Sequence, residues 1–485
     1  SSRATPRRGT AMTTKRPLAS FLLAATLAAG AIAQSATAAN IIIVNNNAPG
    51  IGFNDPTPAA PVGGNPGTTL GQQRLNAFAY AASIWGAQLQ SDVDIRVLAQ
   101  MVPLTCTATS AVLGSAGPRF VLRDFPGALP GHWYHGALGN KLVGADQFGG
   151  APVIGANFNS RLGEPTCLAG SPFYLGLDNN HGGAIDLVAV LLHEFAHGLG
   201  FSTVTNGTTG NYLAGFPSVY DNFAFDNSLG KAWNQMTAPE RQFSAVNGRN
   251  LVWSGANVTA AAPAVLSAGT PELRILAPSS VAGTYLVGAA SFGAALDSPG
   301  LTKQVMQVVD QPDGTGLACN PLDAANARAV KNRIAIVDRG VCAFTVKARN
   351  AQDAGAVGVI VVDNVAASPP AALGGVDPAV TIPAVRVALA DGSALKAAIN
   401  ATPSGRSSGV VARLGVDPSQ LAGADKLGRV MLFSPNPFQG GSSVSHWDTS
   451  AFRNLLMEPS INADLTHSVV PPEDLTLPMF KDLGW

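Results

Sequence analysis

The stretch AIDLVAVLLHEFAHGLGFST, residues 184–203, contains the most specific pattern in this chain. It is apolar almost all round, which predicts a helix that is buried on every side. His193 and His197 are four residues apart, so they lie on one face of such a helix and can share a metal ion. Two histidines and Glu194 are costly to bury unless they are paired or bind a metal. The stretch therefore predicts a buried helix with a metal site.

A third metal ligand is missing from this stretch. Catalytic zinc sites use three protein ligands and keep one position open. In the longer pattern that extends this motif, the third ligand follows Gly200 by three residues. That position holds Thr203, a poor zinc ligand. Either the site is broken, or the ligand comes from elsewhere in the chain.

Several side chains could supply the missing ligand. The other histidines are His132, His135, His181, His446 and His467. The first three lie in Gly- and Asn-rich segments, where we expect solvated side chains, and His181 is the best placed of them because it precedes the helix. Asp221 and Glu240 are rival carboxylate ligands, but neither has the flanking motif that such a ligand usually has.

The composition is that of a globular, loop-rich chain. Of the 485 residues, 46% are hydrophobic and only 12% are charged, and there are 53 glycines and 34 prolines. The high apolar share and the zero net charge argue against intrinsic disorder. The length predicts two or three domains.

Residues 1–39 are predicted to be a secretory signal peptide with a short upstream segment. Lys15 and Arg16 precede the apolar run PLASFLLAATLAAGAIA, small-residue cleavage candidates follow it, and Met12 is the expected true start. A membrane anchor is the alternative, which the short apolar core disfavours. We expect a secreted monomer without a membrane anchor after signal cleavage.

The charge of the mature chain excludes one class of partner. Residues 1–39 contain five of the 30 Lys and Arg residues and no acidic residue, which leaves 25 basic against 30 acidic side chains. There is no basic surface for nucleic acid or anionic lipid.

Four cysteines are an even number, as expected for disulfides in an exported protein. Three pairings are possible. Cys106 and Cys167 lie in one region of the chain, and Cys319 and Cys342 lie in another. Pairing within each region is therefore favoured.

The regions around the metal motif predict a mixture of helices and strands. Residues 71–90 predict an amphipathic helix, 93–97 alternate as in a half-buried strand, and 151–159 are a weaker strand candidate. The apolar residues of the 71–90 helix are Leu75, Phe78, Ala82, Trp85 and Leu89. Near the C-terminus, Leu475, Met479 and Leu483 repeat at helical spacing and predict a short helix against the same core.

Residues 271–409 have a different character, that of small α/β units. Residues 333–340 and 357–364 predict strands, 344–356 predict a helix, and 382–399 predict another strand and helix. The run CNPLDAANARAVKNRIAIVDRGVCAFTVKARNAQDAGAVGVIVVDN closely resembles the protease-associated (PA) domain. The resemblance implies a folded, non-catalytic module that influences substrate access, with a disulfide between Cys319 and Cys342 as in some members.

The segment SHWDTSAFRNLLMEP, which begins at Ser445, resembles the leishmanolysin branch of the metzincin zinc peptidases. Members of that branch carry HExxHxxGF, a long insertion, a distant third histidine and then a Met-turn. The resemblance implies that His193, His197 and His446 bind one zinc ion, that Glu194 is the catalytic base, and that Met457 lies beneath the site. It also implies that the edge strand near 151–159 pairs with an extended substrate.

These features together predict an α+β, metzincin-like zinc peptidase domain with a mixed sheet, an HExxH helix and a Met-turn. An α/β PA domain interrupts it. The expected boundaries are 40–255 for the first part of the catalytic domain, 256–409 for the PA domain and 410–485 for the second part of the catalytic domain. Structural calcium is conceivable among the Asp- and Asn-rich loops but has no motif.

The expected function is that of a secreted zinc endopeptidase acting on proteins or peptides, with Glu194 taking a proton from a metal-activated water. The first alternative is a secreted binding protein that uses the PA domain, with a structural or defunct zinc site. The second is a zinc hydrolase that acts on bonds other than peptides. An intact Glu194 argues against the first alternative, because a structural site needs no base.

Overall fold

The computed structural model describes residues 37–485 except 310, 313, 315, 376 and 402–406. The predicted signal segment 1–39 lies outside the described residues apart from its last three. Residues 37–485 cluster as one unit. Within this unit the apolar side chains form a large core around the HExxH helix and two smaller cores around a second sheet.

The first sheet has four strands in the order β1 (Ile41–Asn45), β2 (Ile95–Val102), β8 (Ile154–Asn159) and β5 (Gly114–Pro118). The first three strands are parallel, and β5 runs antiparallel to β8, so the sheet is mixed as predicted. Side chains of β2 alternate between buried and half-buried, which is the pattern that predicted it.

The expected role of residues 151–159 as the edge strand is wrong. Strand β8, which these residues form, lies between β2 and β5, and β5 is the edge. The order of strands in a sheet depends on contacts between distant segments. The apolar pattern of a single strand therefore does not predict its position in the sheet.

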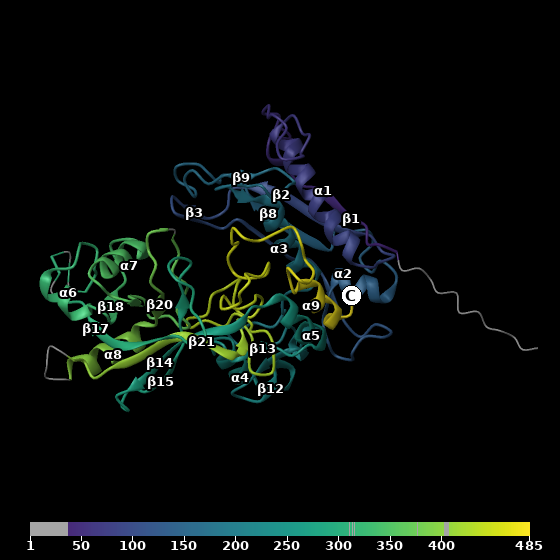
Figure 1. The fold of residues 1–485 in the computed structure, drawn as a ribbon. Coiled ribbons are helices and arrows are strands. Elements are labelled where there is room, and N and C mark those ends of the chain that lie inside the picture. The colour runs from purple at the N-terminus through teal and green to yellow at the C-terminus, as the bar shows by residue number, and fades with distance from the viewer. Residues whose placement is uncertain (1–36, 310, 313, 315, 376, 402–406) are drawn as a thin grey trace, which may run out of the picture. The chain divides into compact units, whose positions relative to one another are not determined.

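Two long helices pack against this sheet and against each other (Figure 1). Helix α1 (Leu70–Gln88) is the predicted 71–90 helix, and Thr69 caps its N-terminus by accepting a hydrogen bond from the Gln72 N–H. Every residue of α3 (Leu187–Leu199), the HExxH helix, is buried as predicted. The Trp85 indole N–H donates to the Leu192 carbonyl at 3.1 Å and joins the two helices. Leu75 departs from the prediction, because its side chain faces solvent.

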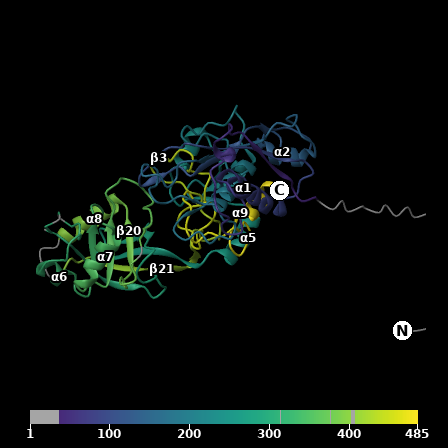
Figure 2. The same cartoon turned by 90° about the horizontal axis from the view of Figure 1, so that it is seen from above.

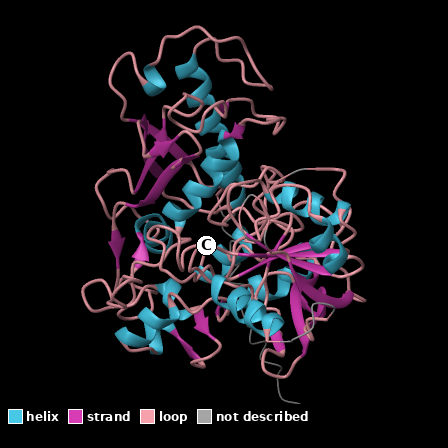
Figure 3. Cartoon of the chain, turned by 90° about the vertical axis from the view of Figure 1, so that its left-hand side faces the viewer, coloured by secondary structure: helices cyan, strands magenta, loops and turns pink. Residues whose placement is uncertain are grey.

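The remaining elements around the first core are short, and long loops connect them (Figure 3). This agrees with the glycine- and proline-rich composition. The predicted C-terminal helix is present as α9 and is buried against α5. These elements are η1 (Gly52–Asn54), β3 (Cys106–Thr107), β4 (Ser110–Ala111), β6 (Val121–Leu122), β7 (Tyr134–His135), α2 (Gly136–Val143), β9 (Phe173–Tyr174), β10 (Ile185–Asp186), η2 (Val219–Asn222), β11 (Ala224–Asp226), β12 (Lys231–Ala232), η3 (Trp233–Gln235), α4 (Ala238–Ser244), β13 (Leu251–Trp253), α5 (Ala256–Val265) and α9 (Thr476–Leu483).

The second sheet has eight strands, in the order β15-β14-β21-β17-β18-β19-β20-β16. Strands β17 to β20 are parallel to one another, and β14 and β21 form a long antiparallel pair. The strands are β14 (Ala268–Ala277), β15 (Gly283–Tyr285), β16 (Gly288–Ala289), β17 (Leu301–Gln307), β18 (Ile334–Asp338), β19 (Gly358–Val362), β20 (Ala384–Val387) and β21 (Val411–Leu421).

Helices α6 (Ala324–Val330), α7 (Phe344–Asp353) and α8 (Leu389–Asn400) flank these strands (Figure 2). Ile334 and Ile336 of β18 belong to one core, which includes Leu395 of α8. Ala335 and Val337 belong to the other core, with α6 and α7. Burial on both faces explains why β18 and β19 are continuous apolar runs, and it confirms the α/β units predicted here.

The boundaries expected for the inserted domain do not match these cores. Helix α5, which the 256–409 range assigns to the insert, contributes Val258 and Ala262 to the first core. Strand β21, which the 410–485 range assigns to the catalytic part, pairs along β14 in the second sheet. We therefore propose that the inserted domain, called the guest below, spans 268–421 and that the host comprises the residues on either side.

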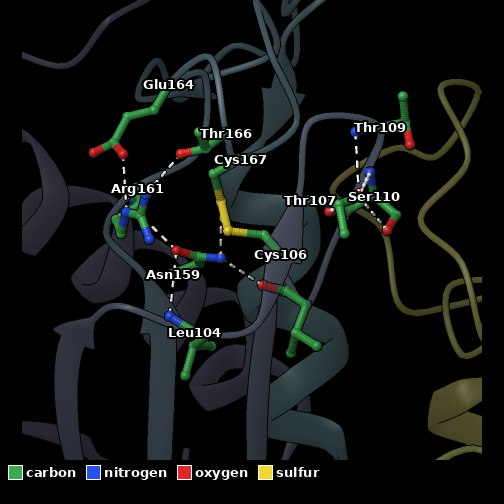
Figure 4. Close-up of a disulfide and its surroundings, with 11 residues drawn as sticks. Leu104, Cys106, Thr107, Thr109, Ser110, Asn159, Arg161, Glu164, Thr166 and Cys167 are labelled. Carbon is green, nitrogen blue, oxygen red and sulfur yellow. Dashed lines mark hydrogen bonds and ion pairs between the residues drawn. A yellow bond between two sulfur atoms is a disulfide. The ribbon is translucent and has the colours of Figure 1, made fainter.

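Both expected disulfides are formed, Cys106–Cys167 and Cys319–Cys342. The first joins the β3–β4 hairpin to the loop after β8 (Figure 4). Beside it the Asn159 side-chain amide donates to the Val112 carbonyl at 3.0 Å, and its oxygen accepts from the Arg161 N–H. This crosslinked corner leads directly into the edge strand β5.

In the described part of the chain, no helix combines the length and apolar character needed to cross a membrane.

Candidate metal centre

Three histidines from distant parts of the chain meet in the first core. His193 and His197 project from α3, and His446 reaches them from a loop 249 residues beyond His197. Each pair of Nε2 atoms is 3.2 Å apart. Among the described residues, no other group of His, Cys, Asp or Glu brings three ligand atoms within 4.8 Å of one another.

The opposite ring nitrogen of each histidine contacts a backbone carbonyl. A carbonyl oxygen can only accept, so each Nδ1 carries the proton and each Nε2 presents a lone pair. The acceptors are the carbonyls of Leu456 for His193 (2.7 Å), Phe201 for His197 (2.8 Å) and Ser442 for His446 (2.8 Å).

This arrangement is suited to a cation. Three lone pairs that face one another at 3.2 Å repel unless a positive charge lies between them. Ligands about 2.0–2.1 Å from a tetrahedral zinc are about 3.3 Å from each other. The donor set, its spacing and its backbone anchors therefore fit a zinc ion with three nitrogen ligands and one open position.

The surroundings keep the three histidines neutral, as metal ligands must be. Burial and, after it, the neighbouring His197 lower the pKa of His193 to about 3. Burial likewise lowers the pKa of His197 to about 4. The pKa of His446 is well below its usual value, mainly through burial and then through the other two histidines.

Glu194 lies beside the histidines and lines the same cleft. Burial raises the pKa of its carboxyl to about 8, although a hydrogen bond from the Ala116 backbone N–H opposes this shift. A cation at the histidines would favour the ionised carboxylate. The side chain is thus placed to exchange a proton near neutral pH when the charge beside it changes.

The cleft in front of the histidines has a volume of about 850 Å³. Apart from the three histidines, Glu194 is the only titratable side chain among the described residues that line it. The β4–β5 segment forms one wall, through residues 110–116, and residues 438–446 and 459–461 contribute the others. The cleft is therefore lined by small hydroxyl-bearing and apolar side chains.

Strand β5 presents a free backbone edge to this cleft. One side of β5 pairs with β8, where the Leu113 carbonyl accepts from Asn159 and the strand register continues to Pro118. The Ala116 N–H points the other way, toward Glu194. Because backbone groups alternate in direction along a strand, the N–H and C=O of Gly114 also face the cleft.

Thr203, at the position where a third ligand was missing, is used differently. Its hydroxyl donates to the Asp221 carboxylate at 2.6 Å, and its N–H donates to the Ser445 hydroxyl at 3.3 Å. Asp221 also accepts from the Thr205 hydroxyl and the Ser218 N–H, so this rival ligand is fully engaged away from the histidines. The other rival, Glu240, pairs with Lys231.

Met457 is fully buried in a turn next to the histidines. Its carbonyl accepts from the N–H of Trp447, the residue after His446, at 2.8 Å. The preceding residue, Leu456, supplies the carbonyl that binds His193. The Leu456 N–H is held in turn by the buried carboxylate of Asp474 at 2.8 Å, a contact for which the sequence carries no signal.

The other histidines lie away from the three Nε2 atoms, and His135 differs from expectation. His135 is buried rather than solvated, and its Nε2 is 2.9 Å from the Ser202 hydroxyl. Burial lowers its pKa to about 4. His181 does not approach the histidine cluster, because its ring nitrogens contact the carbonyls of Ala184 and Ala463.

The last two histidines contact other side chains of this chain. His132 contacts Asn222 at 3.0 Å. His467 pairs at 2.9 Å with Asp186, the residue that caps the N-terminus of α3. An acidic residue just before an apolar helix is a recognisable cap in the sequence, whereas its pairing with His467 is not.

Comparison with known proteins confirms the predicted PA domain, whose family pattern matches residues 302–395. A 42-residue stretch is 50% identical to ER degradation-enhancing alpha-mannosidase-like protein 3 of Xenopus laevis, covering 9% of this chain and 5% of that protein. The chain thus spans a small fraction of the length of this curated relative.

Two solved structures show a partial similarity. An aminopeptidase from Aneurinibacillus sp. strain AM-1 is 24% identical with a TM-score of 0.24, covering 31% of this chain and 32% of that one. BSAP, a zinc aminopeptidase from Bacillus subtilis, is 23% identical with a TM-score of 0.23, covering 33% of this chain and 35% of that one. The chain spans about a third of the length of each, and at these scores neither bears on the metal centre.

Proposed function

We propose that this protein is a secreted zinc endopeptidase of the leishmanolysin-like branch of the metzincins, with a PA domain inserted in its catalytic domain. The observation that carries the proposal is the meeting of three Nε2 lone pairs at 3.2 Å, with Glu194 in the same cleft. In this proposal His193, His197 and His446 bind one Zn²⁺, Glu194 is the base, and Met457 underlies the site.

A zinc ion held there would supply a Lewis acid that acidifies a water molecule and polarises the scissile carbonyl. Glu194 accepts the proton from the attacking water and then gives it to the leaving amine. The Ala116 N–H donates to Glu194 and keeps its carboxyl directed along the cleft wall. The Gly114 backbone on β5 pairs with the extended substrate, which places the substrate across the cleft.

The lining of the cleft favours internal cleavage over removal of terminal residues. An enzyme that recognises a free terminus needs a countercharge for the substrate ammonium or carboxylate. Among the described lining residues, the only acidic or basic side chain besides the histidines is Glu194 itself. A cleft whose lining offers no countercharge for a chain terminus, beside a free strand edge, instead suits the middle of an unfolded chain.

The test is the zinc content and the cleavage activity of the mature protein on peptides blocked at both ends. We expect one zinc per chain and cleavage that chelation abolishes. Glu194→Gln is expected to keep the zinc and to lose about 10²–10⁴-fold in kcat/KM, since it can no longer accept a proton. Glu240→Gln is the matched control, because Glu240 pairs with Lys231 outside the cleft.

Full activity in Glu194→Gln would overturn the mechanism. Cleavage only of peptides with a free terminus would overturn the endopeptidase assignment. Bound zinc without cleavage across a broad peptide library would instead favour the alternative function, a secreted binding protein that acts through the PA domain.

Secretion, the monomeric state and the signal peptide belong to the same proposal. Two disulfides that use all four cysteines are compatible with an oxidising compartment. Sequencing of the N-terminus of exported protein would locate the cleavage point near residue 39.

A further inference from the structure

The loop that carries His446 adopts a backbone conformation that needs external support. His446 Nδ1 bonds back to the Ser442 carbonyl and closes a tight turn. Within this turn Val444 has a φ of +73°, the left-handed region that a β-branched residue rarely adopts. Such conformations persist where surrounding contacts hold them, and they are common at functional sites.

Phe433 supports this loop through backbone bonds to Val444 and His446, and further support comes from η2, a short element of the host far from the loop in sequence. The Tyr220 hydroxyl donates to the Val444 carbonyl at 2.7 Å, at the left-handed residue itself. Tyr220 and Val444 are each 1% exposed, so loss of the hydroxyl removes the side-chain partner of a carbonyl in a buried residue. Asp221, the next residue, holds Thr203, whose N–H donates to the Ser445 hydroxyl.

The ring of Tyr220 also belongs to the aromatic cluster beneath two of the histidines. It packs edge-on against Trp253, with ring centroids 4.8 Å apart, and lies 6.4 Å from Phe201. Phe201 packs against Trp447, next to His446, and its carbonyl accepts from His197. The aromatic packing alone therefore does not require the hydroxyl, which serves the Val444 carbonyl.

We infer that Tyr220 is a positioning residue for the third metal ligand. Its hydroxyl holds the 442–446 turn in the conformation that directs His446 Nε2 toward those of His193 and His197. This inference rests on the proposed zinc site. No sequence motif indicates this role, because Tyr220 and His446 are far apart in the sequence and only the tertiary structure brings them near each other.

The experiment measures the zinc dissociation constant of the full chain by competition with a chelator, in wild type and in Tyr220→Phe. The phenylalanine ring keeps the packing and removes one hydroxyl, and we expect zinc affinity to fall about 10–100-fold. Tyr212→Phe is the matched control: the Tyr212 hydroxyl donates to the Trp233 carbonyl at 2.9 Å, outside the cleft. It should leave zinc affinity unchanged.

A double-mutant cycle separates positioning from general stability. In a His446→Ala background, Tyr220→Phe should have no further effect on zinc affinity, because the ligand it positions is gone. Thermal unfolding of the metal-free variants shows whether both tyrosine changes cost similar stability. A role limited to stability would lower both melting temperatures and leave zinc affinity intact.

The outcomes distinguish this inference from the function it rests on. Wild-type affinity in Tyr220→Phe, together with weakened binding in His446→Ala, would overturn the positioning role and leave the zinc site standing. Equal losses of affinity in Tyr220→Phe with and without His446 would also overturn it. A wild-type protein that binds no zinc would overturn both.

Discussion

The buried carboxyl of Glu194 makes the metal-free protein sensitive to pH. Its pKa is raised by burial to about 8 in the folded chain, whereas an unfolded glutamate titrates near its usual 4.5. The folded state therefore holds a proton that the unfolded state has lost between these values. It follows that the free energy of unfolding falls as the pH rises from about 4.5 to about 8.

Glu194→Gln removes this dependence. Between pH 5.5 and 8.5 the metal-free wild type should lose about 2–4 kcal/mol relative to the variant, as measured by urea unfolding. Glu458, whose pKa burial also raises to about 8, is present in both proteins and cancels. His193 and His197, whose pKa values burial lowers, are likewise present in both proteins and cancel. If the free energy of unfolding changed with pH by the same amount in both proteins, the prediction would be wrong.

At the scale of the element, the edge strand β5 has no room for a side chain at Gly114. A Cβ there would lie 2.9 Å from the Phe158 ring and 3.2 Å from Cγ of Glu194. Because the Phe158 ring is fully buried in the core, the contact with it is relieved only by a shift of β5 or of that ring, and the contact with Glu194 by a shift of the glutamate side chain. The position is thus occupied by glycine because strand and helix approach closely beside the proposed base.

Gly114→Ala is therefore expected to lower kcat/KM about 10- to 100-fold while zinc content stays at one per chain. Gly117→Ala, in the same strand, is the matched control, because a Cβ at Gly117 meets no atom within 4 Å. Steady-state kinetics on one blocked peptide compare the two. Equal rates in both variants would show that β5 does not constrain Glu194.

At the scale of the whole molecule, the guest enters and leaves the host at adjacent residues. Ala268 pairs with Leu421 at the end of the β14–β21 ladder, and the Ala422 N–H donates to the Ser267 carbonyl at 2.9 Å. The buried side chains of the host core come from both flanking parts of the chain, and of the described residues in 268–421 only the half-buried Leu421 packs against this core. We therefore expect the host to fold around this core when the guest is absent.

Replacing residues 268–421 by a short glycine linker should leave a folded host that binds zinc with little change in affinity. The bonds lost would include the one from the Arg249 guanidinium to the Val287 carbonyl and the two backbone bonds between Ser368 and Asn436. Cooperative thermal unfolding and chelator competition check the outcome. A shortened chain that is unfolded, or that binds zinc poorly, would mean that the guest helps to hold the His446 loop.

Local features of this protein were determined by the sequence alone. The spacing of apolar residues along the sequence predicts the HExxH helix, the guest strands β18 and β19 and helix α9. The spacing of the two histidines places them on one face of their helix. Residues a few positions apart are placed relative to each other by the hydrogen bonds of one helix or strand. The pairing of Cys106 with Cys167 and of Cys319 with Cys342 followed from their regions of the chain.

The tertiary structure alone decided the features that join distant segments. The family resemblance implied that 151–159 forms the sheet edge, but β8 is internal and β5 is the edge. The sequence also placed β21 outside the guest and left His135 in solvent. His446 was proposed as a ligand from a resemblance, and its meeting with α3 depends on the turn beneath Tyr220. Such contacts depend on which apolar surfaces bury each other across hundreds of residues, and no local period encodes them.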